Sequence, residues 1–178
     1  MTTIVAVQYT DHVIMASDSR VVGDNRPFHH VDMTKIVDGG RYLIGVAGDM
    51  AALQAIEHRW VIPLPGVRYS HSLLKFAITK IAPSLRAFVE EAKLFTDKQI
   101  EDDETLFSVL LAIDGTLLEI DDSYSVSMRD DGFHAIGSGG DYAIGALLMG
   151  ADVGKALEIA ALSDINTSAP FIFHKQSK

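Results

Sequence analysis

The sequence predicts an α+β fold of four layers, in which two β-sheets pack face to face and helices cover their outer surfaces. Three observations support this prediction. Strand-type and helix-type segments alternate in blocks along the 178 residues. Asp-Gly pairs at 38–39, 114–115 and 131–132 mark tight turns between strand-type segments. The helix-type segments form two pairs, enough for one helical layer on each side.

The first block reads as two hairpins. The segments expected as strands are 4–7, 13–16, 35–37 and 42–46. Tyr9-Thr10-Asp11-His12 joins the first pair, and Asp38-Gly39-Gly40 joins the second, since Asp-Gly supplies the positive φ angles of a tight turn. A looser loop from Val21 to about Met33 separates the two hairpins.

Helical periodicity begins at Asp49, which is suited to cap a helix. The apolar positions of this helix are Met50, Leu53, Ile56 and Trp60, and its breakers are Pro63, Pro65 and Gly66. A second apolar stripe then spans about five turns. Its members are Leu74, Ile78, Ile81, Leu85, Phe88 and Ala92. Pro83 removes a backbone donor within it, so we expect a kink there.

The second half of the chain repeats the pattern. Residues 94–104, rich in Asp and Glu, are expected as an exposed connection. Two further hairpins would then form a second sheet of similar size, with strands at 106–113, 117–120, 124–128 and 133–136. Helices at 142–149 and 153–162 and a closing strand at 171–173 follow. No repeat, low-complexity tract or linker divides the chain, so residues 1–178 are predicted to form a single domain.

Composition excludes several classes of function. The net charge is −9 and Lys and Arg form no cluster, which argues against nucleic acid and anionic membranes as partners. The absence of cysteine excludes disulfides and thiolate zinc sites. No secretory signal or stretch of about 20 uninterrupted apolar residues is present. We therefore expect a cytoplasmic location.

The opening MTTIVAV places a threonine directly after the initiator methionine. Because Thr2 is small, we expect an aminopeptidase to remove Met1. Thr2 would then carry a free α-amine, which titrates near about pH 8, beside its own hydroxyl. Such a residue combines a nucleophile with its general base. An edge strand that happens to begin early would open in the same way, so this feature alone is unspecific.

Five motifs occur in the order and near the spacing of a known pattern: TTIVAV, ASDSR, TKI, GVAGDMA and AIGSGGDYA. With them the chain resembles the proteasome β-subunit superfamily, and within it the HslV-type bacterial proteasome peptidases. The resemblance extends from Thr2 to the last strand. It implies the four-layer αββα sandwich of N-terminal-nucleophile hydrolases, in agreement with the layers predicted above.

The resemblance also implies roles for matching residues. Thr2 takes the place of the nucleophile, with Lys35 as the neighbouring positive charge and Asp18 as the partner that holds this lysine. Gly48 supplies an oxyanion-hole N–H, and Ser138 bonds the amine of the terminal threonine. Blander interpretations remain open: a turn-capping aspartate for Asp18, a solvated lysine for Lys35 and an ordinary turn for Gly48.

The remaining site residues follow from the same resemblance. Asp164 with Thr167, or with Ser168, matches an aspartate and hydroxyl pair, although a helix end followed by a turn fits equally well. The substrate pocket would be lined by Val21, Val46 and Met50, which favours apolar side chains.

No cofactor or metal is implied. The run Gly137-Ser138-Gly139-Gly140 does not complete the dinucleotide-binding fingerprint G-x-G-x-x-G, because its sixth position holds Tyr142 instead of glycine. The adjacent His29-His30 would need further ligands to hold a metal.

The predicted function is that of a threonine endopeptidase subunit acting on peptides or unfolded proteins. The resemblance implies stacked homo-oligomeric rings, with an ATP-dependent unfoldase as a candidate partner. The alternative is a catalytically silent ring or scaffold protein, favoured by a loop before Lys35 that is one residue longer than in HslV types and by the loosely matching segment 163–170. A third hypothesis, an N-terminal amide hydrolase acting on small amides, shares the chemistry but not the motifs.

Overall fold

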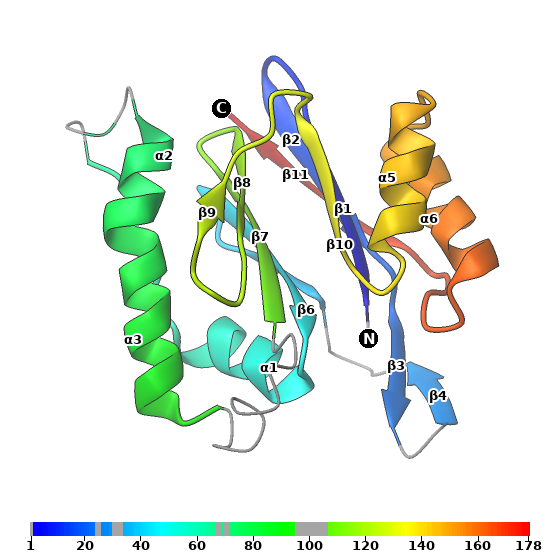
Figure 1. Ribbon diagram of the computed structural model, residues 1–178, viewed down its shortest axis with the longest axis horizontal. Coiled ribbons are helices and arrows are strands. Elements are labelled where there is room, and N and C mark those ends of the chain that lie inside the picture. The colour runs from blue at the N-terminus through cyan, green and yellow to red at the C-terminus, as the bar shows by residue number, and fades with distance from the viewer. Residues whose placement is uncertain (1, 24–25, 30–33, 67–68, 70–71, 95–106) are drawn as a thin grey trace.

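The computed structural model describes residues 2–23, 26–29, 34–66, 69, 72–94 and 107–178. Two β-sheets lie face to face, with α5 (Gly140–Leu148) and α6 (Val153–Ser163) outside one of them. On the outer side of the other sheet lie α1 (Met50–Arg59) and the long rod that ends in α3 (Ala82–Ala92) (Figure 1). The four predicted layers are confirmed.

The first sheet has the strand order β10-β1-β2-β11, and all its pairs are antiparallel. Its strands are β1 (Thr3–Gln8), β2 (His12–Ser17), β10 (Phe133–Gly137) and β11 (Ile172–Ser177). The central strand β1 is buried on both faces, as Ile4, Val5 and Ala6 have no exposed surface. Both predicted strands of the first hairpin are confirmed.

The second sheet has the order β5-β6-β7-β8-β9. Its strands are β5 (Ile36–Asp38), β6 (Tyr42–Gly48), β7 (Phe107–Ile113), β8 (Thr116–Ile120) and β9 (Val126–Ser127). Three apolar cores separate the four layers: one between the two sheets, one beneath α5 and α6, and one beneath α1 and the long helical rod.

The predicted division of strands between the sheets is wrong. The strand at 133–136 does not form a hairpin with 124–128. As β10 it crosses to the first sheet, where Thr3 pairs with Gly137 and Val7 with Phe133. The second hairpin, β5 and β6, joins β7 in the second sheet instead. Turn residues report only local chain reversal, whereas sheet membership depends on which distant edge is available for pairing.

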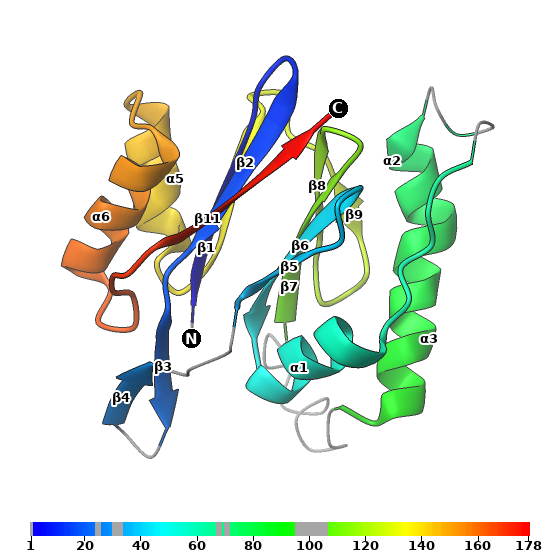
Figure 2. The same cartoon turned by 180° about the vertical axis from the view of Figure 1, so that it is seen from behind.

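The predicted loop from Val21 to Met33 contains two short strands. β3 (Arg20–Gly23) continues from β2, and β4 (Arg26–His29) pairs with it in antiparallel fashion. This ribbon extends past the end of the first sheet on the side where the N-terminus lies (Figures 1 and 2). The remainder of that loop and most of the predicted connection 94–104 lie outside the described residues.

The helices agree with the predicted ranges. Asp49 caps α1 by accepting a hydrogen bond from the Ala51 N–H at 2.7 Å. The stripe over 74–92 folds as α2 (Leu73–Phe76), a π-helical turn η2 (Ala77–Ile81) and α3. The expected disturbance at Pro83 therefore takes the form of a π-helical turn just before the proline.

That π-helical turn shifts the buried face of the rod. Ile78, predicted to be buried, is 50% exposed, while Phe76 and Ala77 are buried in its place. A π-turn adds one residue to the helical repeat, so a stripe counted at 3.6 residues per turn loses register there.

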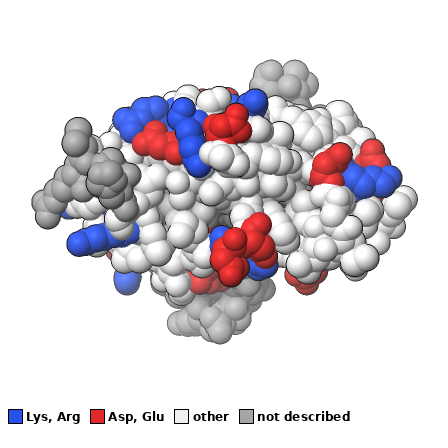
Figure 3. Space-filling view, turned by 90° about the horizontal axis from the view of Figure 1, so that it is seen from above, with Lys and Arg blue, Asp and Glu red and all other residues white. Residues whose placement is uncertain are grey.

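Two further observations bear on partners. On the face seen in Figure 3, Lys and Arg lie beside Asp and Glu rather than in one basic patch. In the part of the chain that the structure describes, none of the helices has the length and apolar character needed to cross a membrane.

Candidate active site

The site is built around the start of β1. Thr2 is 6% exposed and Thr3 is fully buried. The Thr3 N–H donates to Asp18 Oδ1 at 2.9 Å, and the Thr3 carbonyl accepts from the Asp18 N–H at 3.1 Å. Since Asp18 directly follows β2, the antiparallel pairing of β1 with β2 brings its carboxylate to the beginning of the chain.

Asp18 forms a buried ion pair with Lys35. Lys35 Nζ donates to Asp18 Oδ1 at 2.7 Å and to the Arg20 carbonyl at 2.7 Å. The second carboxylate oxygen, Oδ2, accepts from the Arg20 N–H at 2.9 Å. The side chains of Asp18 and Lys35 are 0% and 3% exposed. The solvated lysine and the surface position of Asp18 are therefore wrong, although Asp18 does cap the turn through its bond from the Arg20 N–H.

The environment of Lys35 lowers the pKa of its ammonium below the ordinary value of 10.5, because burial disfavours the charged form. The nearby Asp18 opposes this shift, and so does Asp164 at longer range. Both carboxylates of the site therefore favour the charged form of the same ammonium.

Asp164 is the centre of a second cluster. Its Oδ2 accepts from Ser138 Oγ at 2.7 Å and from Thr167 Oγ1 at 2.6 Å, and its Oδ1 accepts from the Asn166 N–H at 3.1 Å. Burial on its own would raise the pKa of Asp164, but the bonds from Thr167, Ser138 and Asn166 outweigh it and hold the pKa below 3.8.

The two alternatives for this segment both hold. Asp164 is the residue that ends α6, and it also gathers the site hydroxyls. Thr167, rather than Ser168, is its hydroxyl partner; Ser168 Oγ instead accepts from Arg20 Nε at 2.9 Å. Arg20 also donates to the Ile165 carbonyl, so its side chain binds this segment to β3.

A contact between two threonines joins the clusters. Thr3 Oγ1 lies 2.5 Å from Thr167 Oγ1, and both side chains are buried. Sequence reasoning assigned no role to Thr3, Arg20 or Asn166. The order Thr2-Thr3 and the run Asp164-Ile165-Asn166-Thr167 were visible, but only the fold shows which hydroxyls meet.

The glycines of the Gly137–Gly140 segment leave room for the threonines. Gly137 has φ of +91°, and a Cβ there would overlap the Thr2 carbonyl oxygen. A Cβ at Gly139 would overlap Thr3 Oγ1 and lie 2.9 Å from Thr167 Oγ1. The backbone of this segment therefore approaches Thr2 and Thr3 as closely as glycine allows.

We predict that Gly137→Ala destabilises the protein by about 1–3 kcal/mol, because both the positive φ and the close approach of Thr2 exclude a side chain. The matched control is Gly145→Ala, in the middle of α5, where an added Cβ meets nothing within 4 Å. The control is expected to be neutral or stabilising by up to about 1 kcal/mol. Thermal unfolding measures both, and equal melting temperatures would contradict the proximity of Thr2 to this glycine.

Gly48 ends β6 with φ of +135° and is exposed just before the cap of α1. Its neighbour Ala47 lies 3.4 Å from the position of a Cβ at Gly137, which itself adjoins Thr2. The end of β6 is thus close to the start of β1, and the role of Gly48 as an oxyanion donor remains a prediction.

The predicted substrate pocket is only partly accessible. Val21 is 5% exposed, and Val46 is 2% exposed within the core beneath α1 and α3. Met50, at the first turn of α1, is half-buried. Of the three side chains, Met50 alone offers appreciable surface in the isolated chain, so the pocket also remains a prediction.

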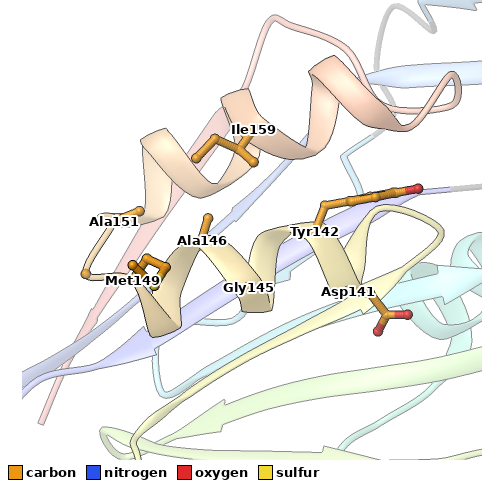
Figure 4. Close-up of a pocket in the computed structure, with 8 residues that line it drawn as sticks. Asp141, Tyr142, Gly145, Ala146, Met149, Ala151 and Ile159 are labelled. Carbon is orange, nitrogen blue, oxygen red and sulfur yellow. The ribbon is translucent and has the colours of Figure 1, made fainter.

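A hollow of about 680 Å³ lies elsewhere, on α5 and α6. Figure 4 shows its lining, which includes Tyr142, Met149 and Ile159. None of the candidate site residues lines it, and it offers one carboxylate, Asp141. It is therefore distinct from the site around Thr2.

Among the described residues, no group of three or more His, Asp and Glu side chains is placed to hold a metal ion. The expectation that His29-His30 would need further ligands to hold a metal is not tested, because His30 and the side chain of His29 lie outside what the structure describes.

No protein-family model matches the sequence. The structure does resemble solved structures over nearly its whole length. Thiobacillus denitrificans BPH in complex with epoxomicin has a TM-score of 0.78 and 16% identity, covering 98% of each chain. HslV from Trypanosoma brucei has a TM-score of 0.67 and 23% identity, covering 99% of each chain.

Anbu, described as an ancestral β-subunit, from Yersinia bercovieri has a TM-score of 0.67 and 16% identity, covering 98% of this chain and 81% of its own. At such low identities these likenesses concern the fold. The chain therefore has the α+β sandwich fold of the proteasome-like N-terminal-nucleophile hydrolases.

Proposed function

We propose that the protein is a threonine endopeptidase whose nucleophile is Thr2, exposed by removal of Met1. The observation that carries this proposal is the buried Asp18–Lys35 pair, whose carboxylate binds the N–H of Thr3, one residue from the nucleophile. Buried ion pairs contribute little net stability compared with apolar replacements, so stability alone does not account for one here.

In the proposed acylation step, the α-amine of Thr2 takes the proton from its own Oγ1, directly or through a water molecule. Oγ1 then attacks the carbonyl carbon of the peptide bond. The oxyanion that forms is stabilised by the N–H of Gly48. The C–N bond breaks as the proton passes from the amine to the departing amine of the substrate, leaving an ester on Thr2.

Deacylation follows the same route in reverse. The amine takes a proton from water, the resulting hydroxide attacks the ester carbonyl, and the bond to Oγ1 breaks. Oγ1 recovers the proton, the carboxylic acid product leaves, and Thr2 is restored. Both steps use one base and one nucleophile that belong to the same residue.

Lys35 favours the reactive state of Thr2 in two ways. Its positive charge disfavours protonation of the neighbouring amine, and it stabilises negative charge developing on Oγ1. Asp18 keeps Lys35 charged and fixed in place. Asp164 supports the same charge and orients Ser138, which we assign as a hydrogen-bond partner of the Thr2 amine.

Epoxomicin tests the proposal, because BPH, which shares the fold, has been solved in complex with it. An epoxyketone has two electrophilic carbons that a hydroxyl and an amine on one residue can both attack. We expect time-dependent loss of peptide hydrolysis with one covalent adduct per chain, and no adduct in Thr2→Ala. Stable wild-type protein with neither hydrolysis nor adduct would favour the silent scaffold.

The proposed chemistry predicts a bell-shaped dependence of peptide hydrolysis on pH. Activity rises with pH as the Thr2 amine loses its proton. In the proposed mechanism the midpoint of this rise lies below about pH 8, the ordinary value for an α-amine, because the charge of Lys35 disfavours protonation of the amine. Activity falls again as Lys35 itself deprotonates, at a pH below 10.5, because burial lowers its pKa. Initial rates across pH measure both limbs, and a flat profile from pH 5 to 10 would contradict these roles.

We also propose that the chain assembles into stacked homo-oligomeric rings in the cytoplasm, with an ATP-dependent unfoldase as a candidate partner. The outer helical layer supports assembly, since Leu148, Met149 and Leu162 are 65%, 88% and 87% exposed. Native mass spectrometry tests this proposal: a monomer at micromolar concentration would contradict it.

A further inference from the structure

We infer that Thr3 is a positioning residue of the proposed peptidase, because its N–H and its hydroxyl tie the two carboxylates of the site to the backbone that carries Thr2. This inference rests on the proposed function and deepens it. No role for Thr3 follows from its position in the sequence, where it is the first residue of a buried strand.

The hydrogen bonds have only one consistent direction. Thr167 Oγ1 carries a single hydrogen, which it donates to Asp164 Oδ2 at 2.6 Å. In the 2.5 Å contact between the two threonines, Thr3 must therefore be the donor. The chain of bonds runs from Thr3 to Thr167 to Asp164, and Ser138 donates to the same carboxylate oxygen.

The backbone of Thr3 is held by the other carboxylate. Its N–H donates to Asp18 Oδ1, the oxygen that also accepts from Lys35 Nζ. Its carbonyl accepts from the Asp18 N–H. Thr3 thus connects the Asp18–Lys35 pair directly to the hydroxyl that bonds Asp164, whereas Arg20 links that pair to the neighbouring Ile165 and Ser168.

The hydroxyl of Thr3 is also confined by packing. The residue is 0% exposed, and a Cβ at Gly139 would overlap its Oγ1. The missing side chain of Gly139 therefore provides the space that the Thr3 hydroxyl occupies. With little space and no water access, the hydroxyl stays aimed at Thr167, and bonds in such a buried chain strengthen one another.

This arrangement determines how Thr2 is presented. Once Met1 has been removed, the peptide bond to Thr3 is the only covalent link between Thr2 and the rest of the chain. The orientation of Thr2 therefore depends on what holds Thr3. Removing the Thr3 hydroxyl leaves Thr167 Oγ1 without its donor and weakens the bond from Thr167 to Asp164. A small displacement of a nucleophile lowers kcat strongly, and we expect KM to stay unchanged because the substrate-binding residues are not altered.

The test compares Thr3→Val, which keeps the shape but loses the hydroxyl, with Thr3→Ser, which keeps the hydroxyl. Thr116→Val, a half-buried strand threonine on β8 outside the site, is the matched control. We expect kcat for peptide hydrolysis to fall about 10-fold or more in Thr3→Val with KM unchanged, and to stay within about 3-fold of wild type in Thr3→Ser. The control should match wild type.

A second readout does not depend on activity. Titration of the Asp164 carboxyl by NMR should show its pKa raised toward 3.8 in Thr3→Val, because a weakened bond from Thr167 stabilises the carboxylate less. Thr3→Ser and the control should leave that pKa where it is in wild type. Should Thr3→Val fail to fold, Thr167→Val interrupts the same chain of bonds and should show the same two changes.

Equal kcat values in Thr3→Val and wild type would overturn the inference, and so would an unchanged Asp164 pKa. Equal loss in the serine and valine variants would also overturn it, since the methyl group rather than the hydroxyl would then matter. If wild type hydrolyses no peptide, the proposed function fails, while the Asp164 titration still decides whether Thr3 acts on that carboxylate.

Discussion

Thr2→Ala is expected to lower peptide hydrolysis at least about 10³-fold and to abolish covalent labelling by an epoxyketone. The variant keeps the α-amine and removes the hydroxyl that attacks the peptide carbonyl. Thr2→Ser keeps both groups and should retain part of the activity. The measurement is kcat/KM on a fluorogenic peptide with an apolar residue before the cleaved bond.

Folding of these variants is the necessary control. Thr2 precedes β1 and lies outside the pairings of β1 with β10 and β2, so all three proteins should melt at similar temperatures. Substantial hydrolysis by Thr2→Ala would show that another residue is the nucleophile. Inactive Thr2→Ser with wild-type melting would show that the hydroxyl and amine are insufficient.

Lys35→Ala is expected to have the second largest effect, with loss of most of the activity and destabilisation of about 3–5 kcal/mol. Removing the ammonium leaves Asp18 fully buried without its opposite charge, which is costly. It also removes the positive charge that, in the proposed mechanism, disfavours protonation of the Thr2 amine. Chemical unfolding and peptide hydrolysis measure the two effects.

Two controls separate catalysis from stability. Lys155→Ala, which breaks an exposed ion pair with Glu158, should change neither quantity measurably. The double variant Asp18→Asn with Lys35→Met removes both charges and should recover much of the stability while remaining inactive. Near-wild-type hydrolysis by Lys35→Ala would refute the role assigned to this charge.

Most helices and strands could be predicted because local sequence patterns determine where they begin and end. Asp49 marked the start of α1, and the Asp-Gly pairs at 38–39 and 114–115 marked hairpin turns. The segments expected as helices at 142–149 and 153–162 form α5 and α6. What the sequence could not indicate was long-range pairing. Nothing local to residues 133–136 shows that this strand lies beside β1, and nothing in the stripe over 74–92 reveals a π-helical turn.

The site was predictable where a short motif carries the chemistry. Asp18, Lys35 and Ser138 were named from motifs, and Asp164 with Thr167 or Ser168 from the wider resemblance. The structure brings Asp18, Lys35, Ser138, Asp164 and Thr167 into two connected clusters. Their catalytic roles stay predictions.

Other contributions depend on geometry that no motif encodes. Thr3 and Arg20 act through contacts with residues more than 140 positions away. Val46 was expected to line a pocket from the resemblance, but its side chain packs into the core of the isolated chain. Alternation along a strand places a residue on one face without revealing whether that face is open.

The most direct measurement is the intact mass and N-terminal sequence of protein that is actively hydrolysing peptide, before and after reaction with an epoxyketone. We expect a chain that begins at Thr2 and gains one inhibitor molecule, attached to that residue. Fully active protein that still carries Met1 would contradict the central claim, because its α-amine would then belong to the wrong residue.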